Sequence, residues 1–203
     1  MKKIVLASGN QKKVKELTEL LAPFNYQIIP QTELGVADVP ETGTTFVENA
    51  IIKARHAAEV TGLPAIADDS GIEVDYLKGQ PGIYSARFAH MNGIQTDDPD
   101  QANNDLLVSK LAGVATEQRT GRYQCILVFM RHAADPTPLI CHGAWEGRIL
   151  EQEVGHGGFG YDPLFWCPEH QCASAELTPE QKAAISHRGK ALRQLMQQIE
   201  NYL

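Results

Sequence analysis

The sequence has no long hydrophobic run. Its longest apolar stretch, about Cys125 to Met130, is far shorter than the ~20 residues that a membrane-spanning helix requires. Two lysines and a few apolar residues open the chain and imitate a signal peptide. However, polar residues from Asn10 to Lys15 stand where the apolar segment of such a peptide would continue. We therefore expect a cytoplasmic protein with no membrane partner.

Positive charge is also scarce. The chain has 18 Lys+Arg against 25 Asp+Glu, a formal net charge of −7. Nucleic-acid backbones select basic surfaces, so this balance argues against a broad nucleic-acid-binding face. It still permits a local basic pocket for one small anion.

Cysteine is rare, with four residues in 203. An even number permits disulfides, but a reducing compartment favours free thiols, and a chain of this length buries enough surface to fold without them. Cys167, His170 and Cys172 are close enough to suggest part of a metal clip. No second ligand pair with matching spacing follows, which argues against zinc.

Several common catalytic signatures are missing. The sequence has no Walker phosphate loop, no Gly-x-Ser-x-Gly and no His-Glu-x-x-His. Gly155, Gly157 and Gly160 match the letters of the dinucleotide fingerprint. The following Tyr161-Asp162-Pro163 does not open a long helix, so we reject that match.

The pattern of apolar residues in the first 70 positions is typical of an α/β protein with a partly parallel sheet. Thr45-Phe46-Val47-Glu48 has the form of a capping box, and Gly62 and Pro64 are typical of a helix end. The pattern predicts a strand over 3–7, a helix from Lys13 to Pro23, a strand over 26–29, a helix from Phe46 to about Gly62, and a strand over 64–67 that stops in 68–71.

The rest of the chain predicts antiparallel additions to this sheet. A helix is expected over 100–111, followed by a hairpin of strands 123–131 and 139–144. Residues 155–163 form a glycine-rich loop. Thr178 and Ser186 are each placed to cap a helix. The fold class is therefore a mixed, central β-sheet flanked by helices.

The segment Ser8-Gly9-Asn10-Gln11-Lys12-Lys13 lies between a predicted strand and a predicted helix. The start of a helix presents backbone N–H groups and the positive end of the helix dipole, which favours phosphate. The alternative is a capped helix with solvated lysines.

Asp68-Asp69-Ser70-Gly71 lies at the predicted carboxyl end of a strand, the edge where open α/β sheets bind ligands. Carboxylates suit Mg²⁺, which is commonly held by one or two of them together with substrate phosphates. Glu41 is the best second carboxylate. Adjacent strand residues point to opposite faces, so one aspartate serves a given site unless the strand ends there. The alternative is an acidic turn.

Two further segments favour recognition of a base. Phe159 or Tyr161 in the glycine loop could stack on it, or could simply pack a turn. Lys182, His187 and Arg188 form a small basic cluster in an acidic chain, and arginine is a rigid donor fork suited to a carbonyl oxygen. The alternative is a capped helix with surface charges.

Taken together these stretches resemble the Ham1-like inosine/xanthosine triphosphate pyrophosphatases. The resemblance runs in family order from residue 4 to about residue 195. It departs at Gln171-Cys172-Ala173-Ser174, where members often have a Gly-Lys-Thr-like stretch. The matching segments are 8–13 with Glu16, 41–43, 45–46, 48–50, 67–71, 81–87, 157–163 and 186–189.

The resemblance implies an enzyme, most often a homodimer, with one elongated, two-lobed nucleoside triphosphate pyrophosphatase domain over residues 1–203. It would hydrolyse ITP, dITP or XTP, with Mg²⁺ as cofactor, to the monophosphate and pyrophosphate. A nucleotide-binding sensor or a general nucleotide phosphatase are the alternatives. The implied roles are a catalytic base and metal ligand (Asp69), a metal ligand (Glu41), and substrate-binding residues (Ser8, Gly9, Asn10, Gln11, Lys12, Lys13, Ser70, Phe159, Gly160, Tyr161, Asp162, Lys182, His187 and Arg188).

Overall fold

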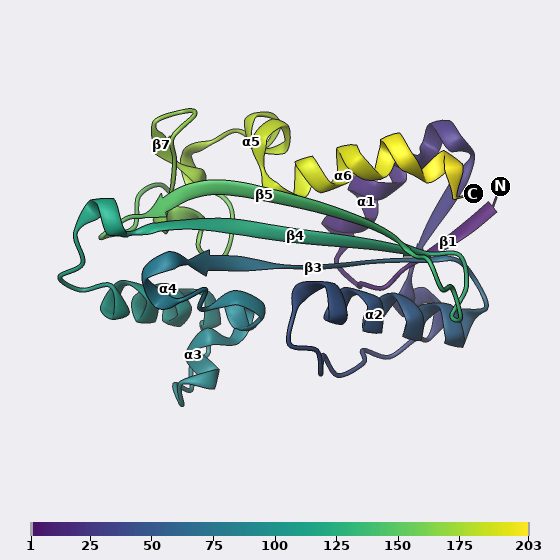
Figure 1. Cartoon of the computed structure of the whole chain (residues 1–203), viewed down its shortest axis with the longest axis horizontal. Helices are drawn as coiled ribbons and strands as arrows, with labels where there is room; N and C mark the ends of the chain where they lie inside the picture. The colour runs from purple at the N-terminus through teal and green to yellow at the C-terminus, as the bar shows by residue number, and fades with distance from the viewer. Residues whose placement is uncertain (1, 203) are drawn as a thin grey trace. The chain divides into compact units, whose positions relative to one another are not determined.

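The computed structural model describes residues 2–202 apart from the side chain of Lys12. Its strands form one seven-stranded sheet in the order β2-β1-β3-β4-β5-β6-β7 (Figure 1). The strands are β1 (Lys2–Leu6), β2 (Tyr26–Pro30), β3 (Ala65–Val74), β4 (Thr120–Met130), β5 (Leu139–Ile149), β6 (Phe165–Cys167) and β7 (Cys172–Ala173). The α-helices are α1 (Gln11–Leu21), α2 (Phe46–Thr61), α3 (Phe88–Met91), α4 (Pro99–Lys110), α5 (Pro179–Ile185) and α6 (His187–Gln198).

The chain divides into two compact units. Unit 1 contains residues 1–69, 125–142 and 191–203, and unit 2 contains residues 70–124 and 143–190. Strands β3, β4 and β5 contribute residues to both units. In unit 1, β1 pairs in parallel with β2 and with β3, which confirms the expected strand–helix–strand–helix–strand start.

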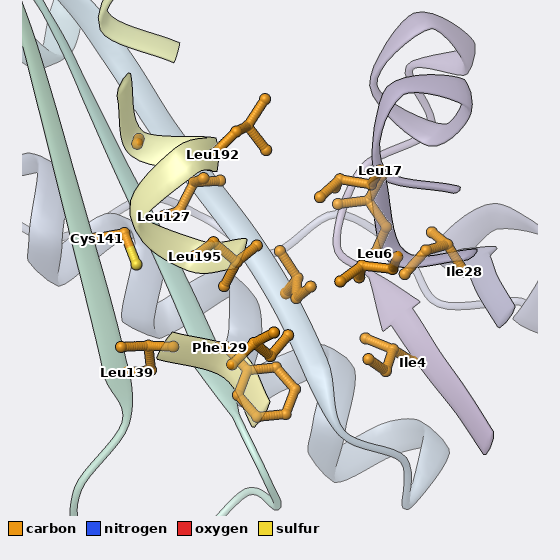
Figure 2. Packing of buried hydrophobic residues seen from close by; sticks show 14 of the residues in the cluster. Ile4, Leu6, Leu17, Ile28, Leu127, Phe129, Leu139, Cys141, Leu192 and Leu195 are labelled. Carbon is orange, nitrogen blue, oxygen red and sulfur yellow. The ribbon is translucent and has the colours of Figure 1, made fainter. Parts of the chain in front are cut away.

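Alternation along the strands of unit 1 builds two separate cores. Ile4 and Leu6 face one side with Ile66, where they pack with residues of α1 and α6. Val5 and Ala65 face the other side, where the alanines of α2 cover them. Figure 1 shows α1 and α6 on one side of these strands and α2 on the other. Figure 2 shows the first core, in which Leu17 of α1 and Leu195 of α6 lie among strand residues such as Leu6.

Unit 2 has a core rich in aromatic residues. Tyr123, Trp145 and Phe165 lie against one another, with ring centroids 4.7–6.1 Å apart. Leu107 and Leu111, from α4 and the residue after it, complete this core. The glycine-rich segment predicted over 155–163 is a loop that passes into a short 3₁₀ helix, Asp162–Leu164.

The expected helix starts are largely confirmed. Thr45 caps α2 by accepting a hydrogen bond from Glu48 N, and Thr178 caps α5 in a full capping box. Ser186 Oγ accepts from Gly189 N, 3.1 Å away, at the start of α6. One detail of the first cap differs from the expected box. The Glu48 carboxylate reaches Thr44 N at 2.7 Å rather than the N–H of Thr45.

The expected end of the strand over 64–67 is wrong. β3 continues through Asp68, Asp69, Ser70 and Gly71 as far as Val74. The reason is burial, because Ile72 and Val74 are fully buried in the core of unit 2 and favour extended backbone. The predicted strand over 139–144 is likewise too short, since β5 reaches Ile149. Within the described residues, no helix is long and apolar enough to cross a membrane.

Candidate active site

The two adjacent aspartates of β3 point to opposite faces of the strand. Asp68 lies on the same face of β3 as Ile66 and binds Lys13 of α1, whose Nζ lies 2.9 Å from both carboxylate oxygens. Asp69 lies on the same face of β3 as Ala67 and binds Lys53 of α2, whose Nζ lies 3.1 Å from Asp69 Oδ1. Because the strand does not end at the pair, each aspartate has a different lysine, and only Asp69 shares a face with Glu41.

Lys53 joins the two carboxylates that the sequence assigned to the metal. Its Nζ lies 2.9 Å from Glu41 Oε1 and 3.1 Å from Asp69 Oδ1. Burial is the largest influence on Lys53 and opposes its charge, yet the carboxylates of Asp69, Glu41 and Asp68 outweigh it and raise the pKa of Lys53. For Asp69, burial is the largest influence and raises the pKa, with help from the charge of Glu41 and against the opposing effect of Lys53.

The start of α2 fixes the loop that carries Glu41. Asn49 Oδ1 accepts from Gly43 N at 2.8 Å, and the Glu48 carboxylate accepts from both the N–H and the hydroxyl of Thr44. A Cβ at Gly43 would lie only 2.6 Å from Glu48 Cβ, so glycine is needed for this close approach. The loop is therefore held against one helix turn, with Glu41 directed at Lys53.

Asp69 retains a buried oxygen with spare acceptor capacity. Within the described residues, no hydrogen bond of normal geometry reaches its Oδ2, although the Asn49 amide is close enough to lower the pKa of Asp69. A buried carboxylate oxygen without a donor is costly, and a cation or a water molecule would relieve that cost.

These residues fit a divalent cation. No group of three or more His, Cys, Asp or Glu side chains among the described residues is arranged to hold a metal. Mg²⁺ does not need such a group, because it is commonly bound by one or two carboxylates plus substrate phosphates. Glu41 and Asp69 supply two carboxylates that already converge on one positive charge, the ammonium of Lys53.

The predicted phosphate segment forms the turn between β1 and α1. Ser8 Oγ accepts from Asn10 N at 3.1 Å, and Asn10 Oδ1 accepts from Lys13 N at 3.3 Å. These bonds order the turn, and the second occupies Lys13 N, one of the four N–H groups that begin this 11-residue helix without a partner inside it. Gly9 approaches Thr32, with 3.0 Å from an added Cβ to Cγ2. The Lys12 side chain lies outside the described residues.

Unit 2 also has an aspartate that binds a lysine, Asp162, which is almost fully buried. Its Oδ2 accepts from Phe159 N at 2.9 Å and from Lys182 Nζ at 2.5 Å. Its Oδ1 accepts from Ser174 Oγ at 2.9 Å and, at a longer 3.5 Å, from Tyr123 OH. This carboxylate joins the glycine loop, α5, β4 and the segment after β7 at one point.

The glycine loop presents Phe159 to solvent. Its side chain is 72% exposed, unusual for a large aromatic residue, and Lys182 Nζ lies 4.9 Å from its ring centroid. Gly158 has φ +78°, and a Cβ there would clash with Asp162 Oδ2, so only glycine permits the turn. Gly160 donates to Asp100 Oδ2 at 3.1 Å. The loop is anchored at both sides of an exposed ring.

The remaining predicted residues of unit 2 come from α6, the glycine loop and β3. The ring of His187 stacks on Tyr123, with centroids 4.7 Å apart and planes 12° from parallel. Arg188 follows in the first turn of α6. Tyr161 is buried and its OH donates to Ser85 O at 2.7 Å, so its ring packs in the core. Ser70 is exposed on β3.

Sequence reasoning missed three residues at these sites, namely Lys53, Asn49 as a contact of Asp69, and Tyr123. A signal existed for Lys53, because a lysine among Ala50, Ala54 and Ala57 on the apolar side of a helix needs a buried partner. No comparable signal existed for Tyr123, whose contacts with Asp162 and His187 depend on residues distant in sequence.

Unit 1 has a helix start that suits phosphate and a pair of carboxylates, and unit 2 has a solvent-exposed aromatic loop with basic residues nearby. These features are typical of α/β proteins that act on nucleotides. The model of the Ham1 family matches residues 4–198. The chain belongs to the Ham1 family.

Similar proteins cover nearly the whole chain. It is 59% identical over 201 residues to a dITP/XTP pyrophosphatase of Photobacterium profundum, covering 99% of this chain and 100% of that protein. It is 56% identical to a dITP/XTP pyrophosphatase of Escherichia coli O157:H7, with the same coverage. Its fold matches a HAM1 protein from Coxiella burnetii with a TM-score of 0.92 and 47% identity, covering 99% of this chain and 100% of that one.

Proposed function

We propose that this chain hydrolyses non-canonical purine nucleoside triphosphates, such as dITP, ITP and XTP, to the monophosphate and pyrophosphate. The observation that carries the proposal is Asp69. It is a half-buried carboxylate with a raised pKa, and its buried Oδ2 is free to accept a proton beside Lys53 and Glu41. Family membership and the names of the relatives support the same reaction.

In this reaction the residues of unit 1 described above, namely Asp69, Glu41, Lys53 and the start of α1, act on the triphosphate. Asp69 takes a proton from the water that attacks the α-phosphorus, which general base catalysis requires. The N–H groups at the start of α1 and the charge of Lys13 favour the phosphate oxygens. Lys53 keeps Asp69 and Glu41 in position and offsets the repulsion between their charges.

We propose Mg²⁺ as the cofactor, with Glu41 and Asp69 as its protein ligands. When bound, it would neutralise phosphate charge and polarise the bond to be broken. Its approach would require Lys53 to give up part of its contact with the two carboxylates. We also propose, from the family resemblance, that the working form is a cytoplasmic homodimer.

In unit 2, Phe159, Lys182, His187 and Arg188 recognise the purine base. Phe159 offers an exposed face on which a base can stack. Hypoxanthine and xanthine carry an acceptor oxygen at position 6, where adenine carries a donor amino group. Donors from His187 and Arg188 would pair with that oxygen and be mismatched by adenine, and a polar mismatch rejects a competitor strongly. Lys182 is held by Asp162 at the edge of the same loop.

Product analysis tests this proposal. ITP and ATP are each incubated with the protein, with and without Mg²⁺, and pyrophosphate is separated from orthophosphate. We expect IMP and pyrophosphate from ITP in the presence of Mg²⁺ and very little turnover of ATP. Orthophosphate from both nucleotides would instead identify a general phosphatase. Tight nucleotide binding with neither product would identify a sensor.

A further inference from the structure

The short hairpin of β6 and β7 places two cysteines directly opposite each other. Cys167 pairs with Cys172 in the antiparallel register, and the four residues 168–171 connect them. Directly opposed residues of antiparallel strands project to the same side, with Cα atoms about 4.5 or about 5.5 Å apart. Both spacings lie within the ~4.4–6.8 Å range that a disulfide spans. We infer that Cys167 and Cys172 form a reversible disulfide when the protein meets a small-molecule disulfide such as oxidised glutathione.

The two thiols differ in access, which sets the order of the reaction. Both are free, Cys172 is half-buried, and Cys167 is fully buried. Cys167 Sγ donates to Glu169 Oε2 at 3.2 Å in the connecting turn. The other two cysteines, Cys125 and Cys141, are fully buried in the core of unit 1, so an oxidant from solvent reaches Cys172 before any other thiol.

The reaction balances as two thiol–disulfide exchanges. The Cys172 thiolate attacks one sulfur of oxidised glutathione, breaks its S–S bond and releases one reduced glutathione. The Cys167 thiolate then attacks the Cys172 sulfur and releases the second. The protein loses two electrons and two protons, and glutathione disulfide gains them. Burial raises the pKa of Cys167 to about 11 and, with the nearby Glu176, raises that of Cys172, so the exchange is faster at alkaline pH.

The hairpin is followed by residues that brace the glycine loop. Ala175 O accepts from Gly157 N at 3.1 Å, and Ser174 Oγ reaches Asp162. Oxidation of the hairpin would therefore stiffen a segment adjacent to Phe159. The inference concerns the thiol pair itself and holds whether or not the proposed reaction is correct.

Mass spectrometry tests the inference. The full-length protein is incubated with oxidised glutathione at pH 8.5, remaining thiols are alkylated, and the intact mass is measured before and after dithiothreitol. We expect a product in which two cysteines are alkylated and the other two are not. Its mass should increase by two hydrogens when dithiothreitol reduces the disulfide. Cleavage after Glu169, which lies between the pair, should leave the two peptides joined until dithiothreitol is added.

Two variants serve as controls. Cys172→Ser changes only the half-buried thiol, and Cys167→Val keeps an apolar side chain in the core. Both should abolish the cross-link, and Cys167→Val should stop at a mixed disulfide of Cys172 with glutathione. A persistent mixed disulfide in the unsubstituted protein, four unreacted thiols, or a cross-link between Cys125 and Cys141 would each overturn the inference.

Discussion

Asp69 of unit 1 and Asp162 of unit 2 each bind a lysine, and the two aspartates use their oxygens differently. Asp162 of unit 2 accepts from four donors, two on each oxygen, which uses the full capacity of a carboxylate. Asp69 of unit 1 accepts from Lys53 on Oδ1, and its buried Oδ2 has no regular donor among the described residues. A saturated carboxylate can hold other groups in place, whereas an unsaturated one can still accept a proton or a cation. We therefore propose that the same residue type serves architecture in unit 2 and chemistry in unit 1.

The largest expected effect is on Asp69. Asp69→Asn should lower kcat for ITP by ~10²–10⁴-fold, the usual contribution of a general base, while the melting temperature stays close to that of the unsubstituted protein. Lys53 keeps Glu41 as a partner in this variant, so the fold should survive. Steady-state kinetics and a thermal melt are the measurements. Activity like that of the unsubstituted protein would remove Asp69 from the mechanism.

Asp162→Asn is the matched change in unit 2 and should show the opposite pattern. The amide cannot accept from all four donors, and hydrogen bonds to a charged group contribute ~1.5–3 kcal/mol each. We expect the free energy of unfolding to fall by about 2 kcal/mol and KM for ITP to rise, with a smaller change in kcat. Urea unfolding and kinetics would measure both. A loss confined to kcat would contradict the division of roles.

Phe159→Ala should affect substrate binding alone. The ring is mostly exposed, so its removal costs little stability, whereas stacking on a base contributes ~1–3 kcal/mol. We expect KM for ITP to rise by about tenfold at an unchanged melting temperature. Phe159→Tyr is the control and should keep the unsubstituted KM. An unchanged KM in the alanine variant would place the base elsewhere.

Arg188→Ala should narrow the preference for ITP over ATP. Loss of a good donor pair to a base edge removes ~1 kcal/mol or more of discrimination, about fivefold in the ratio of the two kcat/KM values. Competition between ITP and ATP in one reaction measures that ratio. If the ratio does not change, the purine is read by other residues.

Asp135→Asn should change stability without changing activity. Arg131 is the largest of the influences that hold the pKa of Asp135 well below its usual range. A lowered pKa in the folded state stabilises the protein above the unfolded-state value of ~3.9 and loses that effect as pH falls below it. We expect a loss of about 1 kcal/mol at pH 7 that shrinks below pH ~4. If the free energy of unfolding fell equally at pH 7 and below pH ~4, the charge of Asp135 would not be the cause.

Local patterns predicted the first half of the fold well. The alanines and the Thr45 cap of α2, and the Gly62 that ends it, follow directly from the sequence and match the structure. The length of β3 did not follow, because Ser70 and Gly71 are typical of a turn. Only the burial of Ile72 and Val74 in unit 2 keeps them extended. Packing between distant segments, which no short window contains, decided that element.

The sequence predicted which residue types form the candidate site, but not which of them contact one another. Glu41, Asp69 and Lys13 could be named as candidates, yet nothing in the sequence pairs Lys13 with Asp68 or places Lys53 between two carboxylates. Those pairings depend on how helices cover the two faces of a strand. Asp162 was expected to line the base, and the structure gives it four internal partners.

The alternation of β3 has a consequence for how this protein can vary. Asp68 and Asp69 are adjacent in the sequence and opposed in space, each committed to a different lysine. A one-residue deletion ahead of the pair would move both to the wrong faces, whereas the connection over 131–138 could change length without disturbing either. A substitution in this strand changes one side chain, whereas a change in its length moves every later side chain to the opposite face. We expect insertions and deletions in descendants of this chain to collect in its loops and to avoid the stretch from Ala65 to Asp69.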